Sequence, residues 1–128
     1  MNLKTQEIES VIKLEPFERY KYSLKRIADN ETLYTIKRDN ETIAISDLDD
    51  EKLIPFWSAK QFAELNITDE WNEFYVEEIS LDDFENEMVD FINENNFLMN
   101  IFPINNKTGF VVSLDEFIRD LYIELERF

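Results

Sequence analysis

The chain has 128 residues and a formal net charge of −16, with 29 Asp and Glu, 13 Lys and Arg, and no His or Cys. Without His and Cys it lacks the commonest general base, the thiol nucleophile and the nitrogen and sulfur metal ligands. Because a surface this negative repels nucleic acid and anionic membranes and attracts cations or basic proteins, we expect no nucleic-acid partner and no membrane association.

The composition predicts one globular domain over residues 1–128. Apolar residues make up 44% of the chain and eleven are Phe, which is ample material for a core. A single Gly and three Pro leave little room for long loops. The N-terminus has no apolar signal region, and no apolar stretch approaches the roughly 18 residues of a membrane span. Together with the absence of Cys, this predicts a cytoplasmic protein.

Two helices are predicted at the N-terminus. A short apolar stripe of Ile8, Val11 and Ile12 should end before Pro16, which is tolerated in the first turn of a second helix. One face of the second helix should be buried, namely Phe17, Tyr20, Leu24, Ile27 and Ala28. Its other faces carry the only basic cluster, Arg19, Lys21, Lys25 and Arg26. We interpret this cluster as counter-charges to the protein's own acids.

Three strands are predicted next. Leu33–Arg38 and Thr42–Ser46 flank Asp39-Asn40-Glu41, a plausible hairpin turn. In the second strand the alternation predicts that Ile43 and Ile45 face the core. The third strand, Lys52–Trp57, contains Pro55. Because proline cannot donate a backbone hydrogen bond, this strand should lie at an edge or pair on one side only at Pro55.

Later strands are predicted at Glu73–Ile79, Phe97–Ile104 and Gly109–Val112. Within the second of these, the stretch Phe97–Phe102 is apolar on both faces, which favours a central strand covered on both sides. The segment Asn105–Gly109 is expected to form a hairpin loop.

Three helix starts share one pattern, a serine three residues before a carboxylate or amide, at Ser58, Ser80 and Ser113. The helix after Ser80 should bury Leu81, Phe84, Met88, Phe91 and Ile92, and the helix after Ser113 should bury Leu114, Phe117, Ile118, Leu121, Tyr122, Leu125 and Phe128. The order of elements predicts an α+β domain with a mostly antiparallel sheet of about five or six strands covered by helices. Two helices lie at the N-terminus and one long helix at the C-terminus.

Several segments carry a family resemblance. They are Arg19-Tyr20, Leu24–Glu31, Leu53–Ser58, Phe62–Leu65, Glu70-Trp71, Phe102-Pro103 and Gly109–Ser113. In this order they resemble a bacterial family of small domains, domain of unknown function 2750. This chain departs from the family pattern at Thr42-Ile43, where Gly-Trp is usual, and at Ser58, where Pro is usual. The resemblance implies the fold and a cytoplasmic setting, and it carries no activity.

The sequence contains little that indicates a metal site or a catalytic site. Alternating carboxylates at Asp47, Asp49 and Glu51 match the first ligands of a calcium loop, but its sixth position holds Lys52 instead of Gly. We therefore interpret this segment as a solvated acidic turn, and we predict no metal site, no cofactor and no catalytic residue. The carboxylates nearest to apolar positions, and so the best remaining acid–base candidates, are Glu78 and Asp120.

The two tryptophans differ in their surroundings. Trp57 is expected in the core, whereas Trp71 lies in a polar segment and is the better candidate for partial exposure.

The acids are concentrated in one part of the chain. Residues 61–106 contain twelve Asp and Glu and no Lys or Arg. An ordinary solvated helix alternates the sign of its charges, so the helix after Ser80 suggests an interaction surface. The predicted partner-binding residues are Asp69, Glu70, Trp71, Glu73, Asp82, Glu85 and Glu87.

Two functions compete for this surface. The first is an acidic protein-binding module, such as an immunity or antitoxin-type protein, that docks a basic partner protein. The alternative is a small carboxylate- or divalent-cation-dependent enzyme or ligand-binding domain with a cleft near the two tryptophans. A third interpretation is that the acidity serves solubility alone.

Overall fold

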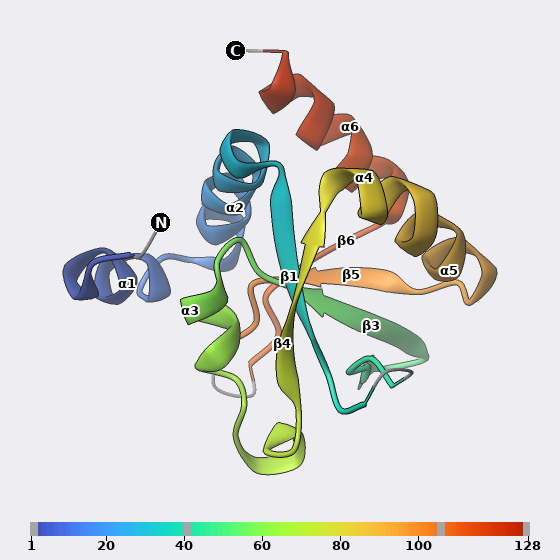
Figure 1. The fold of residues 1–128 in the computed structure, drawn as a ribbon, viewed down its shortest axis with the longest axis horizontal. Helices are drawn as coiled ribbons and strands as arrows, with labels where there is room; N and C mark the ends of the chain where they lie inside the picture. The colour runs from blue at the N-terminus through green and yellow to red at the C-terminus, as the bar shows by residue number, and fades with distance from the viewer. Residues whose placement is uncertain (1–2, 40–41, 105–106, 127–128) are drawn as a thin grey trace.

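The structure, a computed structural model, describes residues 3–39, 42–104 and 107–126 (Figure 1). Its helices are α1 (Thr5–Ile12), α2 (Pro16–Asn30), α3 (Lys60–Glu64), the 3-10 turn η1 (Asp69–Trp71), α4 (Leu81–Asp83), the π-helical turn η2 (Phe84–Met88), α5 (Val89–Glu94) and α6 (Leu114–Leu125). Its strands are β1 (Thr32–Lys37), β2 (Ser46–Leu48), β3 (Glu51–Phe56), β4 (Tyr75–Ser80), β5 (Leu98–Ile101) and β6 (Phe110–Val112).

The six strands form two sheets. One has four strands in the order β2-β3-β5-β6, and the other pairs β1 with β4. Only β3 and β5 run parallel, while every other pair is antiparallel. The α+β class, the mostly antiparallel pairing and the long C-terminal helix are therefore confirmed. The predicted single sheet of about five or six strands is corrected to one sheet of four strands and one of two.

Pro55 explains why the sheets stay separate. Tyr34 of β1 and Trp57 exchange both backbone hydrogen bonds, with N···O distances of 2.9 and 2.8 Å. The next such pair along this ladder would join Ile36 to Pro55, and proline has no N–H to give. The Ile36 carbonyl accepts instead from the Ala44 N–H at 3.0 Å. The prediction that the strand pairs on one side only at Pro55 is confirmed, since β5 pairs there, whereas the pairing of β3 with β2 ends at Leu53.

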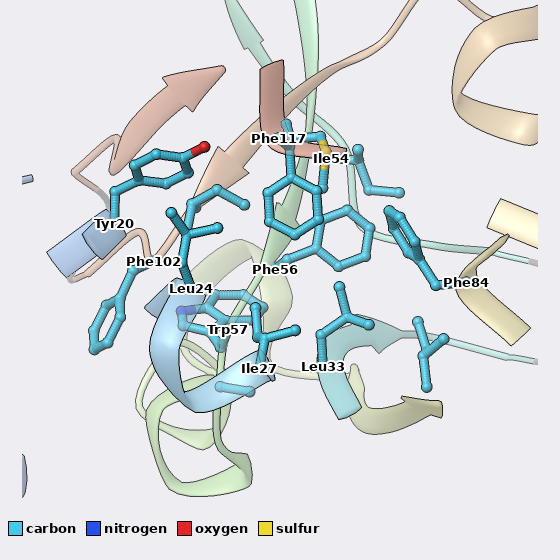
Figure 2. Packing of buried hydrophobic residues seen from close by; sticks show 14 of the residues in the cluster. Tyr20, Leu24, Ile27, Leu33, Ile54, Phe56, Trp57, Phe84, Phe102 and Phe117 are labelled. Carbon is cyan, nitrogen blue, oxygen red and sulfur yellow. The ribbon is translucent and has the colours of Figure 1, made fainter. Parts of the chain in front are cut away.

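β5 lies between β3 and β6, as predicted for a central strand. Its pairing aligns Ile54, Met99 and Val112 in one row of the sheet and Phe56, Ile101 and Phe110 in the next. Within the core the rings of Phe56, Phe84 and Phe117 meet edge to face, at centroid distances of 5.7 and 5.8 Å (Figure 2). Such pairs contribute about 0.5–1.5 kcal/mol beyond their burial. They attach η2 and α6 to β3.

The two N-terminal helices are confirmed, with Pro16 in the first turn of α2. Two side chains of α2 differ from the prediction. Phe17 is 50% exposed, whereas Arg19 is only 7% exposed. The guanidinium of Arg19 is buried because the chain around Phe102 passes beside α2. It donates through Nε to the Phe102 carbonyl at 3.3 Å and through Nη1 to the Leu14 carbonyl.

The predicted strand Thr42–Ser46 is reduced to a bridge between Lys37 and Ile43. Here the chain leaves β1 for the four-stranded sheet, so regular alternation is lost. The residue that faces the core is Ala44, at 1% exposure, while Ile43 and Ile45 are only partly buried. In the predicted turn and the predicted loop, residues 40–41 and 105–106 lie outside the described residues, as does residue 128 of the last helix.

Two of the three predicted serine caps are confirmed. Ser80 Oγ accepts from the Asp83 N–H at 3.1 Å, and Ser113 Oγ accepts from the Glu116 N–H at 3.2 Å. At the third position the prediction is wrong. α3 begins one residue later with Ala59 as its N-cap, and the buried Ser58 Oγ has no hydrogen-bond partner among the described residues.

This difference between the serines is measurable. Ser80→Ala and Ser113→Ala should each lower the free energy of unfolding by about 1 kcal/mol, because each removes an acceptor for a helix-end N–H. Ser58→Ala should not lower it, because the Ser58 hydroxyl has no hydrogen-bond partner within the described part of the chain. Urea unfolding followed by circular dichroism measures all three variants. An equal loss for Ser58→Ala would contradict the assignment of its hydroxyl.

Candidate functional site

The segment α4–η2–α5 carries an acidic face. We use this name for the exposed carboxylates of Asp82, Asp83, Glu85, Glu87, Asp90 and Glu94. The other side of the segment is anchored by buried Leu81, Phe84, Met88 and Ile92, with Ser80 capping its first turn. Phe91, which was also expected inside, is only partly buried. The predicted partner-binding residues Asp82, Glu85 and Glu87 thus all belong to this exposed set of carboxylates.

The acidic face has no cationic partners among the residues that the structure describes. None of its six carboxylates lies in an ion pair with Lys or Arg within residues 3–39, 42–104 and 107–126. Pairs such as Asp90 and Glu94 place like charges four residues apart, which destabilises a helix by about 0.2–0.5 kcal/mol per pair. These repulsions between like charges oppose folding of the segment.

Helix α6 adds an aromatic side chain to the acidic face. Tyr122 is 48% exposed although the sequence predicted it to be buried, and its hydroxyl donates to Glu85 Oε1 at 3.1 Å. This bond and the charge of Glu85 raise the pKa of Tyr122. Glu85 lies in the π-helical turn η2, and single π turns inside helices are frequent at functional sites.

The other predicted residues lie elsewhere. Residues 69–71 form η1, where Glu70 is exposed and Trp71 half-buried, and Glu73 is exposed in the following loop. This group precedes β4, whereas the acidic face follows it (Figure 1). A six-residue strand is about 17–20 Å long. The seven predicted residues therefore form two separate groups at opposite ends of β4.

Trp71 and Glu70 line a cavity of about 280 Å³, together with Ser46, Asp47, Asn66, Thr68, Asn100, Pro103, Lys107 and Thr108. Asn66 and Asn100 are buried, and neither was predicted from the sequence as a site residue. Asn100 Oδ1 accepts from the Gly109 N–H at 2.8 Å, and Asn66 Nδ2 donates to the Phe62 carbonyl at 3.0 Å. A lone Asn inside an otherwise apolar strand was the available signal for Asn100.

The residues considered for metal binding and catalysis have other contacts. Asp47 pairs with Lys52 at 2.8 Å, and Asp49 takes a left-handed φ of 55° in the turn between β2 and β3. Across the described part of the chain, no group of three or more Asp, Glu, His or Cys could hold a metal ion.

The two acid–base candidates each accept a hydrogen bond from a tyrosine. Asp120 accepts from the Tyr20 hydroxyl at 2.7 Å, and Glu78 accepts from the Tyr34 hydroxyl at 3.1 Å. Burial, followed by these bonds, raises the pKa of both tyrosines. The two carboxylates therefore fix neutral tyrosines at their positions.

These features define a small α+β domain with two sheets and an acidic helical face. Residues 20–121 match the model of a family described as a protein of unknown function (DUF2750). The match spans well over half of the chain, which therefore belongs to this family. Neither a curated protein nor a solved structure matches it. Among the described helices, none has the length and apolar character needed to cross a bilayer.

Proposed function

We propose that this chain is a cytoplasmic protein-binding module that docks a basic partner protein on its acidic face, in the manner of an immunity or antitoxin-type protein. The observation that carries the proposal is the set of six exposed carboxylates without a cationic partner in the described chain. A partner that supplies Lys and Arg would relieve the mutual repulsion of these carboxylates.

The exposed Tyr122 beside Glu85 supports the same proposal. Tyrosine is enriched among residues that dominate the binding energy of protein interfaces, and charged residues are typical of the rim. A surface with an aromatic side chain among carboxylates combines these two features. Such a negative surface would also steer a basic partner during approach, so association should be fast and sensitive to salt.

The test compares two variants of equal charge. One carries Asp82→Asn, Glu85→Gln and Glu87→Gln on the acidic face. The control carries Asp49→Asn, Asp50→Asn and Glu51→Gln, three exposed acids at the β2–β3 turn. Basic proteins retained by the immobilised chain at low salt are identified by mass spectrometry, and the association rate of each is then measured by stopped-flow fluorescence. The acidic-face variant should associate about tenfold more slowly at low salt, with the difference fading as salt rises.

An equal slowing by both variants would contradict the proposal, because it would reflect net charge alone. So would an unchanged association rate for the acidic-face variant.

The alternative function is the binding of a small ligand. The cavity beside Trp71 is where such a ligand would bind. In that case Trp71→Ala would abolish binding of the ligand, while the acidic-face variant would bind it normally.

A further inference from the structure

A second cavity, of about 310 Å³, lies where α2, β1, β4 and the start of α3 come together. It is lined by Arg26 and Asn30 of α2, Thr32 and Tyr34 of β1, residues 58–61, and Glu78 of β4. It shares no lining residue with the Trp71 cavity or with the acidic face. Binding in this cavity is therefore independent of the docking of a protein on the acidic face.

Two buried polar atoms in its lining have no hydrogen-bond partner among the described residues, Ser58 Oγ and Arg26 Nε. Ser58 is only 2% exposed. Buried polar groups in folded proteins nearly always have partners, so each exception requires an explanation. The only other such atom in the described chain is Ser23 Oγ, which lies in α2 and does not line this cavity. Two residues that line this cavity thus each have a potential donor atom without a partner among the described residues.

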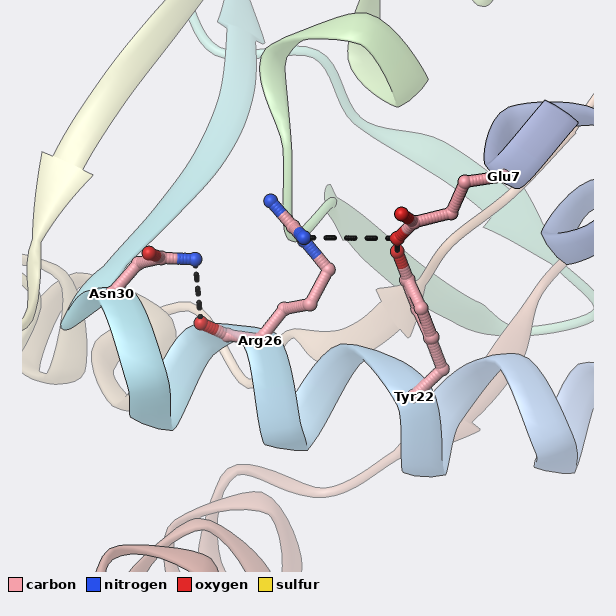
Figure 3. A network of polar contacts seen from close by, with 4 residues as sticks. All are labelled: Glu7, Tyr22, Arg26 and Asn30. Atoms are coloured by element: carbon pink, nitrogen blue, oxygen red, sulfur yellow. Dashed lines mark hydrogen bonds and ion pairs between the residues drawn. The ribbon is translucent and has the colours of Figure 1, made fainter. Parts of the chain in front are cut away.

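The lining is also cationic, in contrast to the rest of the protein. Arg26 and Lys60 contribute two positive charges, and Glu78 is the single carboxylate. Lys60 makes no ion pair within the described chain. Arg26 Nη1 is 3.8 Å from Glu7 Oε2, which also accepts from the Tyr22 hydroxyl. Figure 3 shows that the opposite end of the guanidinium points away from Glu7.

We propose that this cavity binds a small molecule through a phosphate or carboxylate group. The planar guanidinium of Arg26 and the ammonium of Lys60 supply the charge, since charge-assisted hydrogen bonds are the strongest that these groups make. The hydroxyl of Ser58 donates the third hydrogen bond. Glu78 lies on the β4 side, where the Tyr34 hydroxyl donates to it, and its charge opposes the bound anion.

The test is a titration of the full chain with sodium phosphate and, separately, with sodium succinate, both against sodium chloride at equal ionic strength. The backbone amide signals of Ser58, Lys60 and Gln61 are followed by nuclear magnetic resonance. We expect saturable shifts of these signals with phosphate or with succinate, and the anion that saturates identifies the group. Linear shifts that chloride reproduces for both anions would overturn the proposal.

Variants identify the contacts. Ser58→Ala and Lys60→Gln should each weaken binding about tenfold, while Glu78→Gln should tighten it severalfold by removing the opposing charge. A gain of affinity cannot result from misfolding. Lys25→Gln is the matched control, because it removes the same charge from an exposed position of α2 outside the cavity. Binding that Lys25→Gln weakens as much as Lys60→Gln, or that Ser58→Ala leaves unchanged, would overturn the proposal.

Discussion

Gly109→Ala should lower the free energy of unfolding by about 3 kcal/mol or more. A Cβ at this position would lie 2.1 Å from the Ile101 carbonyl oxygen and 2.7 Å from the carbonyl carbon and oxygen of Phe102. These are backbone atoms of the central strand and of the residue after it, so no side-chain rotation can relieve the overlap. Gly109 has no positive φ, so the lack of space is the sole reason for glycine.

Urea unfolding followed by circular dichroism measures this effect, with Thr108→Ala as the control. Thr108 is exposed and adjacent in the chain, and its substitution should change stability by about 0.5 kcal/mol at most. Total stabilities of domains are about 5–15 kcal/mol, so Gly109→Ala removes a large share. A variant within about 1 kcal/mol of the parent protein would mean that the chain before β6 can move away from β5.

Trp57→Ala should lower the free energy of unfolding by about 3–5 kcal/mol, the range observed when large buried aromatic residues are truncated. Trp57 is fully buried, as the sequence predicted, and its Nε1 donates to the Pro103 carbonyl at 3.0 Å. Its backbone also forms the bridge to Tyr34 that joins the two sheets. The indole therefore fills the core at the point where the two sheets meet.

Trp57→Phe separates the two contributions of the indole. It keeps most of the apolar volume but leaves the Pro103 carbonyl without its donor, which costs about 1–3 kcal/mol. Trp71→Ala serves as the control, because the half-buried Trp71 leaves a smaller cavity. Circular dichroism is the appropriate signal, since each variant removes one of the two tryptophan fluorophores. A Trp57→Ala variant as stable as Trp71→Ala would contradict the assignment of Trp57 to the centre of the core.

Local patterns in the sequence predicted most elements of the fold. The apolar stretch at residues 97–102 identified the central strand, and Pro55 identified the place where strand pairing is interrupted. Both predictions rely on the period of side chains along a strand or on a missing backbone N–H, which are properties of the residues themselves. The caps at Ser80 and Ser113 were likewise predicted from a local pattern, a serine three residues before a carboxylate.

Local patterns do not reveal how distant segments meet or where the chain turns between two elements. Arg19 is buried because residue 102 supplies a carbonyl to it, and Ser58 does not cap because the chain turns into α3 one residue later. The two groups of predicted partner-binding residues looked continuous because they follow each other in sequence. The length of β4 separates them, and only the topology reveals this.

The parallel pairing of β3 with β5 has a consequence for how fast the protein folds. Residues 57–97 separate β3 from β5, so the pairing of these two strands closes a long loop. Closing such a loop carries an entropic cost that slows folding. All twelve acids of residues 61–106 fall inside this connection. Their mutual repulsion expands the unfolded chain between the two strands. Because dissolved salt screens this repulsion, we expect the rate at which β3 and β5 pair to rise with salt concentration.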